Sequence, residues 1–117
     1  MSDEGKREFR NRVLYDLLRT GPVVDFDWTA HAKDRVRELT AQGLDPLDLA
    51  GIVGERRPVV WSHQYCGPTI TCGDFGVPLI MTEDAKVLAV TALPSSRSAW
   101  RKVYETGITS VGRERRF

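Results

Sequence analysis

The sequence has no long apolar segment, few cysteines and almost no net charge. Its longest apolar stretch, residues 77–81, contains a proline and is far too short to cross a bilayer. The two cysteines, Cys66 and Cys72, are too few for a disulfide framework, so we expect free thiols. The net charge of +1 argues against a strong, non-specific polyanion binder. The first residues, MSDEGKREFR, lack the apolar core of a secretory signal, which predicts a cytoplasmic protein or a payload exported by another route.

The 117 residues favour one soluble domain with a modest core. Positive charge gathers at the end of the chain, because residues 94–117 carry 6 basic and 2 acidic side chains. A basic terminal segment is able to hold phosphate groups. A solvated tail over residues 108–117 fits the same composition, and both interpretations stay open.

Helical patterns fill the first half of the chain. Ser2 is expected to cap a first amphipathic helix within residues 1–21, which Gly21 and Pro22 end. Its predicted core stripe consists of Phe9, Val13 and Leu17, widened by Leu14 and Leu18.

Two further helices are predicted after it. Thr29 caps a helix over residues 30–42, which Gly43 ends in a left-handed conformation. Asp45 and a proline then begin a shorter, acidic helix over residues 46–54. The core stripe of the helix at 30–42 is Ala32, Val36 and Leu39.

From Pro58 onward the apolar period changes from four to two, which predicts strands. The residues expected on one side of the first strand are Val59, Trp61, His63 and Tyr65. The pair at 67–68, Gly-Pro, is predicted to turn the chain into a strand over 69–75. Further strands over 79–82 and 87–93 follow, and serines after Pro94 cap a last helix.

This order of elements predicts an α+β fold. The N-terminal helices pack on one face of a four-stranded antiparallel meander over residues 58–93, with a short C-terminal helix. We expect the other face of the sheet to be open. The chain is interpreted as a single domain, residues 1–117, with an additional helix at 1–21, a core at 26–104 and a basic tail at 108–117.

Three stretches carry a resemblance to a known family: FDWTAHAKDRVREL, QGLDPLDLAGIV and KVLAVTALPSSRSAWRKVY. Over about residues 26–104 the chain resembles the small RelE-like toxins. It is most similar to the BrnT type and to a related group that opens with His-Ala-x-x-Arg, here His31, Ala32 and Arg35.

The resemblance implies a RelE-like fold and a metal-independent endoribonuclease that needs no cofactor. Such toxins help a 2′-hydroxyl attack the adjacent phosphate of an RNA, free or on the ribosome, and an antitoxin neutralises them. The chain departs from the family in one respect. Active members display basic side chains from the sheet, whereas the predicted strands after the first carry none between their turns.

RNA cleavage of this kind needs a base, cations around the phosphate and an acid for the leaving oxygen. The candidate catalytic residues are His31, Arg35, His63 and Tyr104, and the candidate phosphate-binding residues are Arg97, Arg101 and Lys102. We expect His31 and Arg35 to form one edge of a phosphate site. Arg97 and Arg101 form the other edge, which requires the starts of the second and last helices to be neighbours. An ordinary helix surface, with Arg35 paired to a nearby carboxylate, is the alternative.

Other functions fit parts of the pattern. A non-catalytic protein-binding module on the same scaffold could dock a partner on an aromatic sheet face formed by Trp61, Tyr65 and Phe75. A zinc site from His31, His63, Cys66 and Cys72 matches no standard zinc spacing. A DNA-binding regulator is disfavoured because the predicted third helix is acidic rather than basic.

Overall fold

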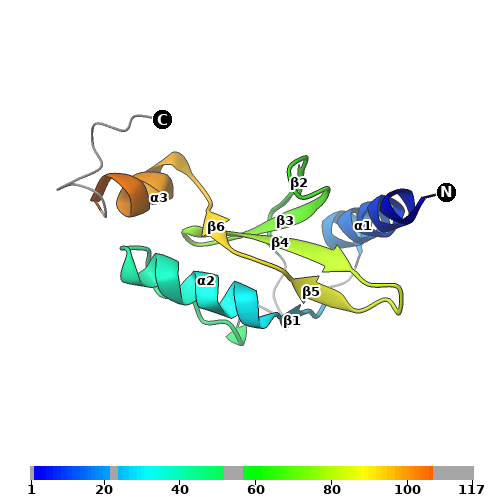
Figure 1. Cartoon of the computed structure of the whole chain (residues 1–117), viewed down its shortest axis with the longest axis horizontal. Helices are drawn as coiled ribbons and strands as arrows, with labels where there is room; N and C mark the ends of the chain where they lie inside the picture. Colours follow the sequence, from blue (N-terminus) through cyan, green and yellow to red (C-terminus); the bar gives the residue numbers. More distant parts are fainter. Residues whose placement is uncertain (1, 22–23, 52–56, 107–117) are drawn as a thin grey trace.

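The structure, a computed structural model, describes residues 2–21, 24–51 and 57–106. Helix α1 (Asp3–Thr20) comes first, followed by strand β1 (Asp27–Trp28) and helix α2 (Ala30–Ala41). Strands β2 (Val59–Ser62), β3 (Gly67–Cys72), β4 (Phe75–Met81), β5 (Val87–Ala89) and β6 (Leu93–Pro94) then build the sheet. The short helix α3 (Arg97–Arg101) continues as a π-helix, η2 (Lys102–Thr106) (Figure 1). The α+β class and the short C-terminal helix are confirmed. In the described residues, no helix combines the length and apolarity needed to span a membrane.

The sheet is mixed rather than a four-stranded antiparallel meander, so that prediction is wrong. Its strand order is β1-β5-β4-β3-β2, and β6 pairs with the start of β4. The neighbouring pairs β2–β3, β3–β4 and β4–β5 are antiparallel. The pair β1–β5 is parallel. The short strand before α2 was too brief to give a periodic signal, and only its pairing with β5 defines it.

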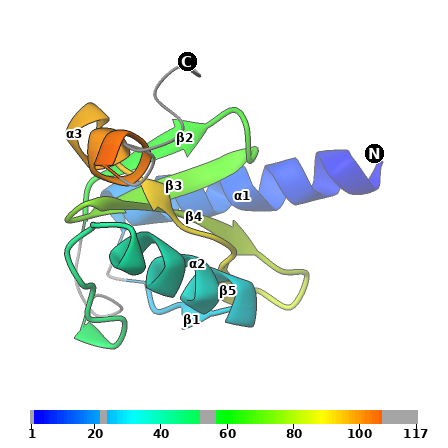
Figure 2. The ribbon, with the colours of Figure 1, turned by 60° about the vertical axis from the view of Figure 1, so that its left-hand side comes forward.

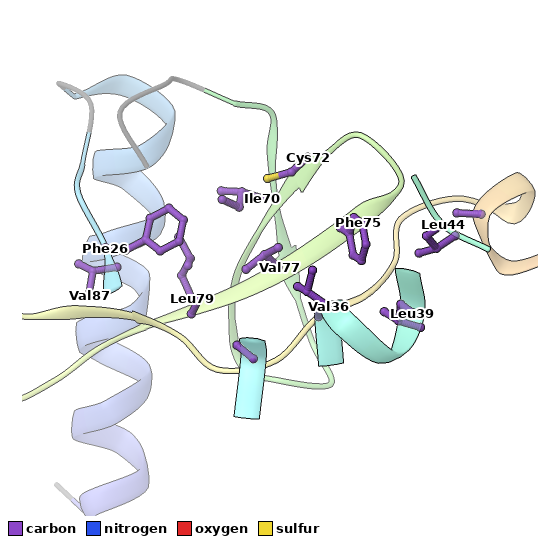
Figure 3. Close-up of a cluster of buried hydrophobic side chains, with 14 of the residues drawn as sticks. Phe26, Val36, Leu39, Leu44, Ile70, Cys72, Phe75, Val77, Leu79 and Val87 are labelled. Atoms are coloured by element: carbon purple, nitrogen blue, oxygen red, sulfur yellow. The ribbon is translucent and has the colours of Figure 1, made fainter. Parts of the chain in front are cut away.

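Both faces of the central strands are covered, although the sequence predicted one open face. Residues 67–70 of β3 and 75–79 of β4 are all buried, and successive side chains in a strand point to opposite faces. Helix α1 packs against β2, β3 and β4, whereas α2 contacts β6. In both overall views α1 passes behind the central strands and α2 lies on the near side (Figures 1 and 2). Figure 3 shows β4 in the core, where Phe75 and Val77 lie close to Val36 of α2.

The first hairpin turns earlier than predicted. Strand β2 ends at Ser62, and residues 63–66 form the turn, so His63 lies outside the strand. The turn is fixed locally, because Ser62 Oγ accepts a hydrogen bond from Tyr65 N and Cys66 has a positive φ of 50°. The predicted turn residues at 67–68 instead begin β3 and pair with β2.

Helix α1 is confirmed, but it packs through a different face. The Ser2 side chain accepts from Gly5 N, as expected of its cap. Asn11 and Leu14 are fully buried, whereas the predicted core stripe is exposed. The exposed fractions of that stripe are 61% for Phe9, 39% for Val13 and 40% for Leu17. Contacts with distant parts of the chain determine which face of α1 is buried, and the spacing of apolar residues does not predict them.

Helix α2 begins and ends as predicted. Thr29 Oγ1 accepts from Ala32 N, and Gly43 follows the helix with a φ of +122°. The predicted helix at 46–54 is not formed over its described part, because residues 44–48 are irregular and Leu49 lies in a turn. The Trp28 indole donates to Leu49 O at 3.0 Å, which holds this segment extended against β1. Residues 52–54 of that prediction, and the tail at 108–117, lie outside the described residues.

Candidate nucleic-acid interface

The last helix carries two arginines and two aromatic residues on the side opposite Ala99 and Val103, and one of the aromatic residues, Tyr104, is half-buried against the core. The residues are Arg97, Trp100, Arg101 and Tyr104, and we call this surface the last-helix face. Their spacing of three and four residues places them together, whereas Ala99 and Val103 are buried against the domain. The Trp100 and Tyr104 rings lie 4.0 Å apart between centroids at an interplanar angle of 38°. Trp100 remains 38% exposed despite this contact.

The helix is held in place by contacts with the β3–β4 turn. Ser96, one of the serines expected to cap it, accepts from Ala99 N. Ser95 N donates to Asp74 O at 2.8 Å, and Ser95 Oγ donates to Gly73 O at 3.0 Å. The last-helix face is therefore carried on a fixed element of the fold.

Lys102 takes part in this docking. Its Nζ lies 2.9 Å from Asp74 Oδ2 and 4.0 Å from Asp45 Oδ2. The hydrogen bond to Asp74 raises the pKa of Lys102, and the same bond, with a second from Asp45 N, lowers the pKa of Asp74. The sequence predicted Lys102 as a phosphate ligand, but its ammonium already has a carboxylate partner. This ion pair competes with the predicted role of Lys102 as a phosphate ligand.

The chemistry of the last-helix face suits single-stranded RNA. Exposed aromatic rings stack on unpaired bases, and guanidiniums bind phosphate oxygens through two parallel hydrogen bonds. The described strands β3, β4 and β5 carry no lysine or arginine. The sheet itself therefore offers no phosphate ligand along these strands, and the basic groups near it come from the helix.

His31 and Arg35 lie elsewhere on the domain. Both sit in the first half of α2, where Thr29 N donates to Ala89 O of β5. The last helix instead lies over the other end of α2, where Gly43 meets the backbone of Lys102 (Figure 1). His31 lies ten residues before the end of α2, which is about 15 Å along a helix. The expected adjacency of the two helix starts is therefore wrong.

The local surroundings of His31 and Arg35 are those of a helix surface. His31 is exposed, and Arg35 Nη1 lies 3.1 Å from Glu38 Oε1, an ion pair that the alternative interpretation anticipated. The Arg35 side chain is 28% exposed, so part of its stem is covered. The two residues remain one turn apart, as the family motif requires.

His63 and the cysteines do not form a metal site. His63 is exposed in the β2–β3 turn, and its carbonyl accepts from Cys66 Sγ. Cys72 is fully buried in β3. In the parts of the chain that the structure describes, no three histidine, cysteine, aspartate or glutamate side chains are grouped closely enough to hold a metal ion.

The aromatic sheet face predicted for protein docking is absent. Phe75 is fully buried, and Trp61 packs edge-on against Tyr15 of α1 at 5.7 Å between centroids. An apolar groove lies instead beside α2. Its lining consists of Lys33, Val36, Arg37, Thr40, Ala41, Pro46, Leu47 and Leu49.

Sequence reasoning missed two structural features of the last helix. It named no role for Trp100, whose ring contacts that of the half-buried Tyr104 and stays partly exposed. It also assigned no role to Asp74, because nothing local shows that a turn aspartate meets a lysine 28 residues later. Comparisons with protein-family models, with curated proteins and with solved structures find no match to this chain.

Proposed function

We propose that this protein binds single-stranded RNA through the last-helix face and cleaves it without a metal, as RelE/BrnT-like toxins do. The observation that supports this most is the gathering of Arg97, Trp100, Arg101 and Tyr104 on one side of a docked helix. An antitoxin would silence the protein in the cell, as the resemblance implies.

The proposed roles follow from chemistry. Arg97 and Arg101 hold the phosphate, Trp100 stacks on a base, and the Tyr104 phenol serves as an acid for the leaving oxygen. His31 lies about 15 Å away along α2, too far to act on the same phosphate as Tyr104, so His31 and Arg35 are proposed to contact the strand at another nucleotide. Because both sites lie on the α2 side of the domain, at opposite ends of that helix, a single strand laid along α2 reaches both.

RNA affinity tests the binding step. Arg97→Ala combined with Arg101→Ala should weaken binding of a fluorescent single-stranded RNA and lower the slope of log affinity against log salt by about 1.4. The matched control is Lys33→Ala with Arg37→Ala, which has the same spacing and charge change on the exposed side of α2. Equal losses in both double variants would show general charge attraction and contradict the proposed interface.

Cleavage is tested separately. The wild-type protein, in a buffer with a metal chelator, should yield RNA fragments that end in a cyclic phosphate. Tyr104→Phe should slow this reaction on the order of a hundredfold while leaving affinity nearly unchanged, because a general acid acts on the reaction rather than on binding. Binding without any cleavage would remove the enzymatic part of the proposal and leave an RNA-binding protein.

The groove beside α2 favours a second candidate, a non-catalytic protein-binding module. It combines apolar walls from Val36, Leu47 and Leu49 with two cations at its edge, Lys33 and Arg37. This composition suits an apolar segment with acidic flanks. Failure of both RNA assays, with binding of an acidic amphipathic peptide lost in Leu47→Asp, would favour this candidate.

A further inference from the structure

Strand β2 lies at an edge of the sheet, so only one side of its backbone is paired. The strand order runs from β1 at one edge to β2 at the other (Figure 1). Thr71 N donates to Pro58 O at 3.0 Å, which makes these facing residues a hydrogen-bonded pair. Hydrogen-bonded and non-hydrogen-bonded pairs alternate along an antiparallel ladder. The residues of β2 that bond to β3 are therefore Val60 and Ser62.

The N–H and C=O groups of Val59 and Trp61 point outward from the sheet as a result. Among the described residues, none of these four groups has a hydrogen-bond partner. The Trp61 side chain is already held in place. Its ring packs edge-on against Tyr15 at 5.7 Å between centroids, and the Arg12 guanidinium lies 3.8 Å from its centroid. A strand that is ordered in advance loses little conformational freedom when a second strand pairs with it.

The β2 edge lacks the features that usually keep strand edges apart. Such edges are commonly very short, carry charges or are covered by another segment. The β1 edge has these features, because it has two residues, one of them the exposed Asp27, and its Trp28 indole binds Leu49 O. Strand β2 has four residues, none of them charged, and its Val60 is 58% exposed. This edge is therefore suited to pairing with another strand.

A second copy of β2 fits this edge in a register that uses every outward group of the strand. In a two-fold antiparallel pair centred on Val60, Val59 faces Trp61 of the second copy, and Trp61 faces its Val59. These are the residues whose N–H and C=O groups point outward, so each facing pair exchanges two hydrogen bonds. The outward donors and acceptors of β2 are thus complementary to those of a second β2.

The side chains agree with the same register. Val60 meets Val60 of the second copy at the centre, so two exposed apolar side chains cover each other. Val59 beside Trp61 is a cross-strand pair of a β-branched and an aromatic residue, which is a favourable combination. Beyond β2, Arg57 would face His63 of the second copy, and two basic side chains do not favour a longer pairing. The contact is therefore confined to β2.

We propose that two copies of this chain pair through β2 in this register, which joins their sheets across a two-fold axis. The pairing uses no residue of the last-helix face or of α2, so it is independent of the proposed function. Four backbone hydrogen bonds and a small apolar contact make a weak dimer, with an expected dissociation constant between about 10 µM and about 1 mM.

Disulfide trapping tests the register in a Cys66→Ser background, since Cys72 is fully buried. Val60→Cys should form a covalent dimer on mild oxidation, because the Cα atoms of a facing non-hydrogen-bonded pair lie about 4.5 Å apart, within disulfide range. The matched control is Val13→Cys, at a 39% exposed valine on α1. It should cross-link at least about tenfold more slowly, through collisions alone. Equal rates for the two variants would overturn the proposal.

Hydrogen exchange of the wild-type backbone amides tests which groups pair. The N–H groups of Val59 and Trp61 should exchange more slowly as the protein concentration rises, because only the dimer covers them. The N–H groups of Val60 and Ser62 bond to β3 and should be protected at every concentration. Exchange at Val59 and Trp61 that is independent of concentration would contradict the pairing.

Sedimentation velocity over a range of concentrations tests the energetics. The wild type should dimerise, and Val60→Lys should raise the dissociation constant at least about tenfold, since two like charges then face each other. Val13→Lys makes the same change at another exposed valine and should leave the dimer unaffected. A wild type that is monomeric at about 1 mM, or equal effects of the two variants, would contradict the proposal. Circular dichroism melts verify that each variant is folded.

Discussion

The Asn11 side chain bridges the chain before β3 and the end of β4, where the two backbones do not pair with each other. The last pair in the register of β3 and β4 is Thr69 with Pro78, and three positions further on Cys66 and Met81 would face each other. They do not bond directly. Asn11 Nδ2 donates to Cys66 O, and Met81 N donates to Asn11 Oδ1, each at 3.0 Å. A fully buried carboxamide thus replaces a peptide group at the end of the sheet and fixes the orientation of α1.

Asn11→Asp should therefore destabilise the fold strongly. The carboxylate cannot donate to Cys66 O, and a buried charge without a partner is costly, so we expect a loss of roughly 2–4 kcal/mol in the free energy of unfolding. Urea denaturation measures it. Glu8→Gln, an exposed change on the same helix, should stay within about 0.5 kcal/mol. If Asn11→Asp unfolds at the wild-type midpoint, the carboxamide has no structural role.

At the scale of elements, Asp74 connects the β3–β4 turn to the two segments that flank it. Its carboxylate accepts from Lys102 Nζ and from Asp45 N, and its carbonyl accepts from Ser95 N. Asp74 thus supplies the shorter of the two ion pairs that Lys102 makes, at 2.9 Å against 4.0 Å to Asp45. These contacts stabilise the charged forms of both Asp74 and Lys102.

The shifted pKa values predict a pH window for this attachment. The pKa of Asp74 is lowered, so its contribution to stability is present above the unfolded value of about 4 and disappears as the pH falls through the folded value. The pKa of Lys102 is raised, so its contribution is present below about 10.4 and disappears as the pH rises through the folded value. Asp74→Asn should lower the melting temperature at pH 7 and make little difference at about pH 2.

Asp45→Asn is the matched control, since this carboxylate is 84% exposed and lies 4.0 Å from Lys102 Nζ. Its effect at pH 7 should be smaller than that of Asp74→Asn. Equal effects of the two variants at every pH would show that the Asp74 contact does not dominate the attachment.

At the scale of the whole molecule, the capping signals of the helices were more predictable from sequence than the contacts between distant segments. The caps depend on neighbouring residues, and the sequence predicted Ser2 and Thr29, whereas for the last helix it left open which of three serines caps, and the structure selects Ser96. The inward face of α1 is set by the hydrogen bonds of Asn11 with Cys66 and Met81, which lie 55 and 70 residues away in the sequence. The spacing of apolar residues within the helix gives no information about such contacts. The stripe of larger apolar residues therefore predicted the wrong face.

For the candidate site, the sequence predicted which residues group within the last helix but not where that helix lies in the fold. The sequence identified Arg97, Arg101 and Tyr104 because their spacing lies within one helix. It placed them beside His31 by analogy, whereas the docking of the last helix on the β3–β4 turn brings it to the other end of α2. The extended segment after α2 was predicted as helix because Asp-Pro and the following leucines are typical of a helix start.

The three tryptophans report on three separate surfaces. Trp28 lies just before α2, close in sequence to His31, and its indole donates to Leu49 O. Trp61 is covered by Arg12 of α1, whose guanidinium lies 3.8 Å from the ring centroid. Trp100 belongs to the last-helix face. Each indole N–H gives its own signal in a ¹⁵N-correlated NMR spectrum, assignable with single tryptophan-to-phenylalanine variants.

Titration of the labelled protein with a short single-stranded RNA tests the central claim, that the last-helix face binds RNA. The Trp100 indole signal should shift or broaden progressively, because a stacked base changes the ring environment, while the Trp61 signal stays in place. A smaller change at Trp28 is compatible with a strand that runs along α2. A spectrum in which Trp28 or Trp61 moves while Trp100 does not, or in which no indole signal responds, would contradict the account.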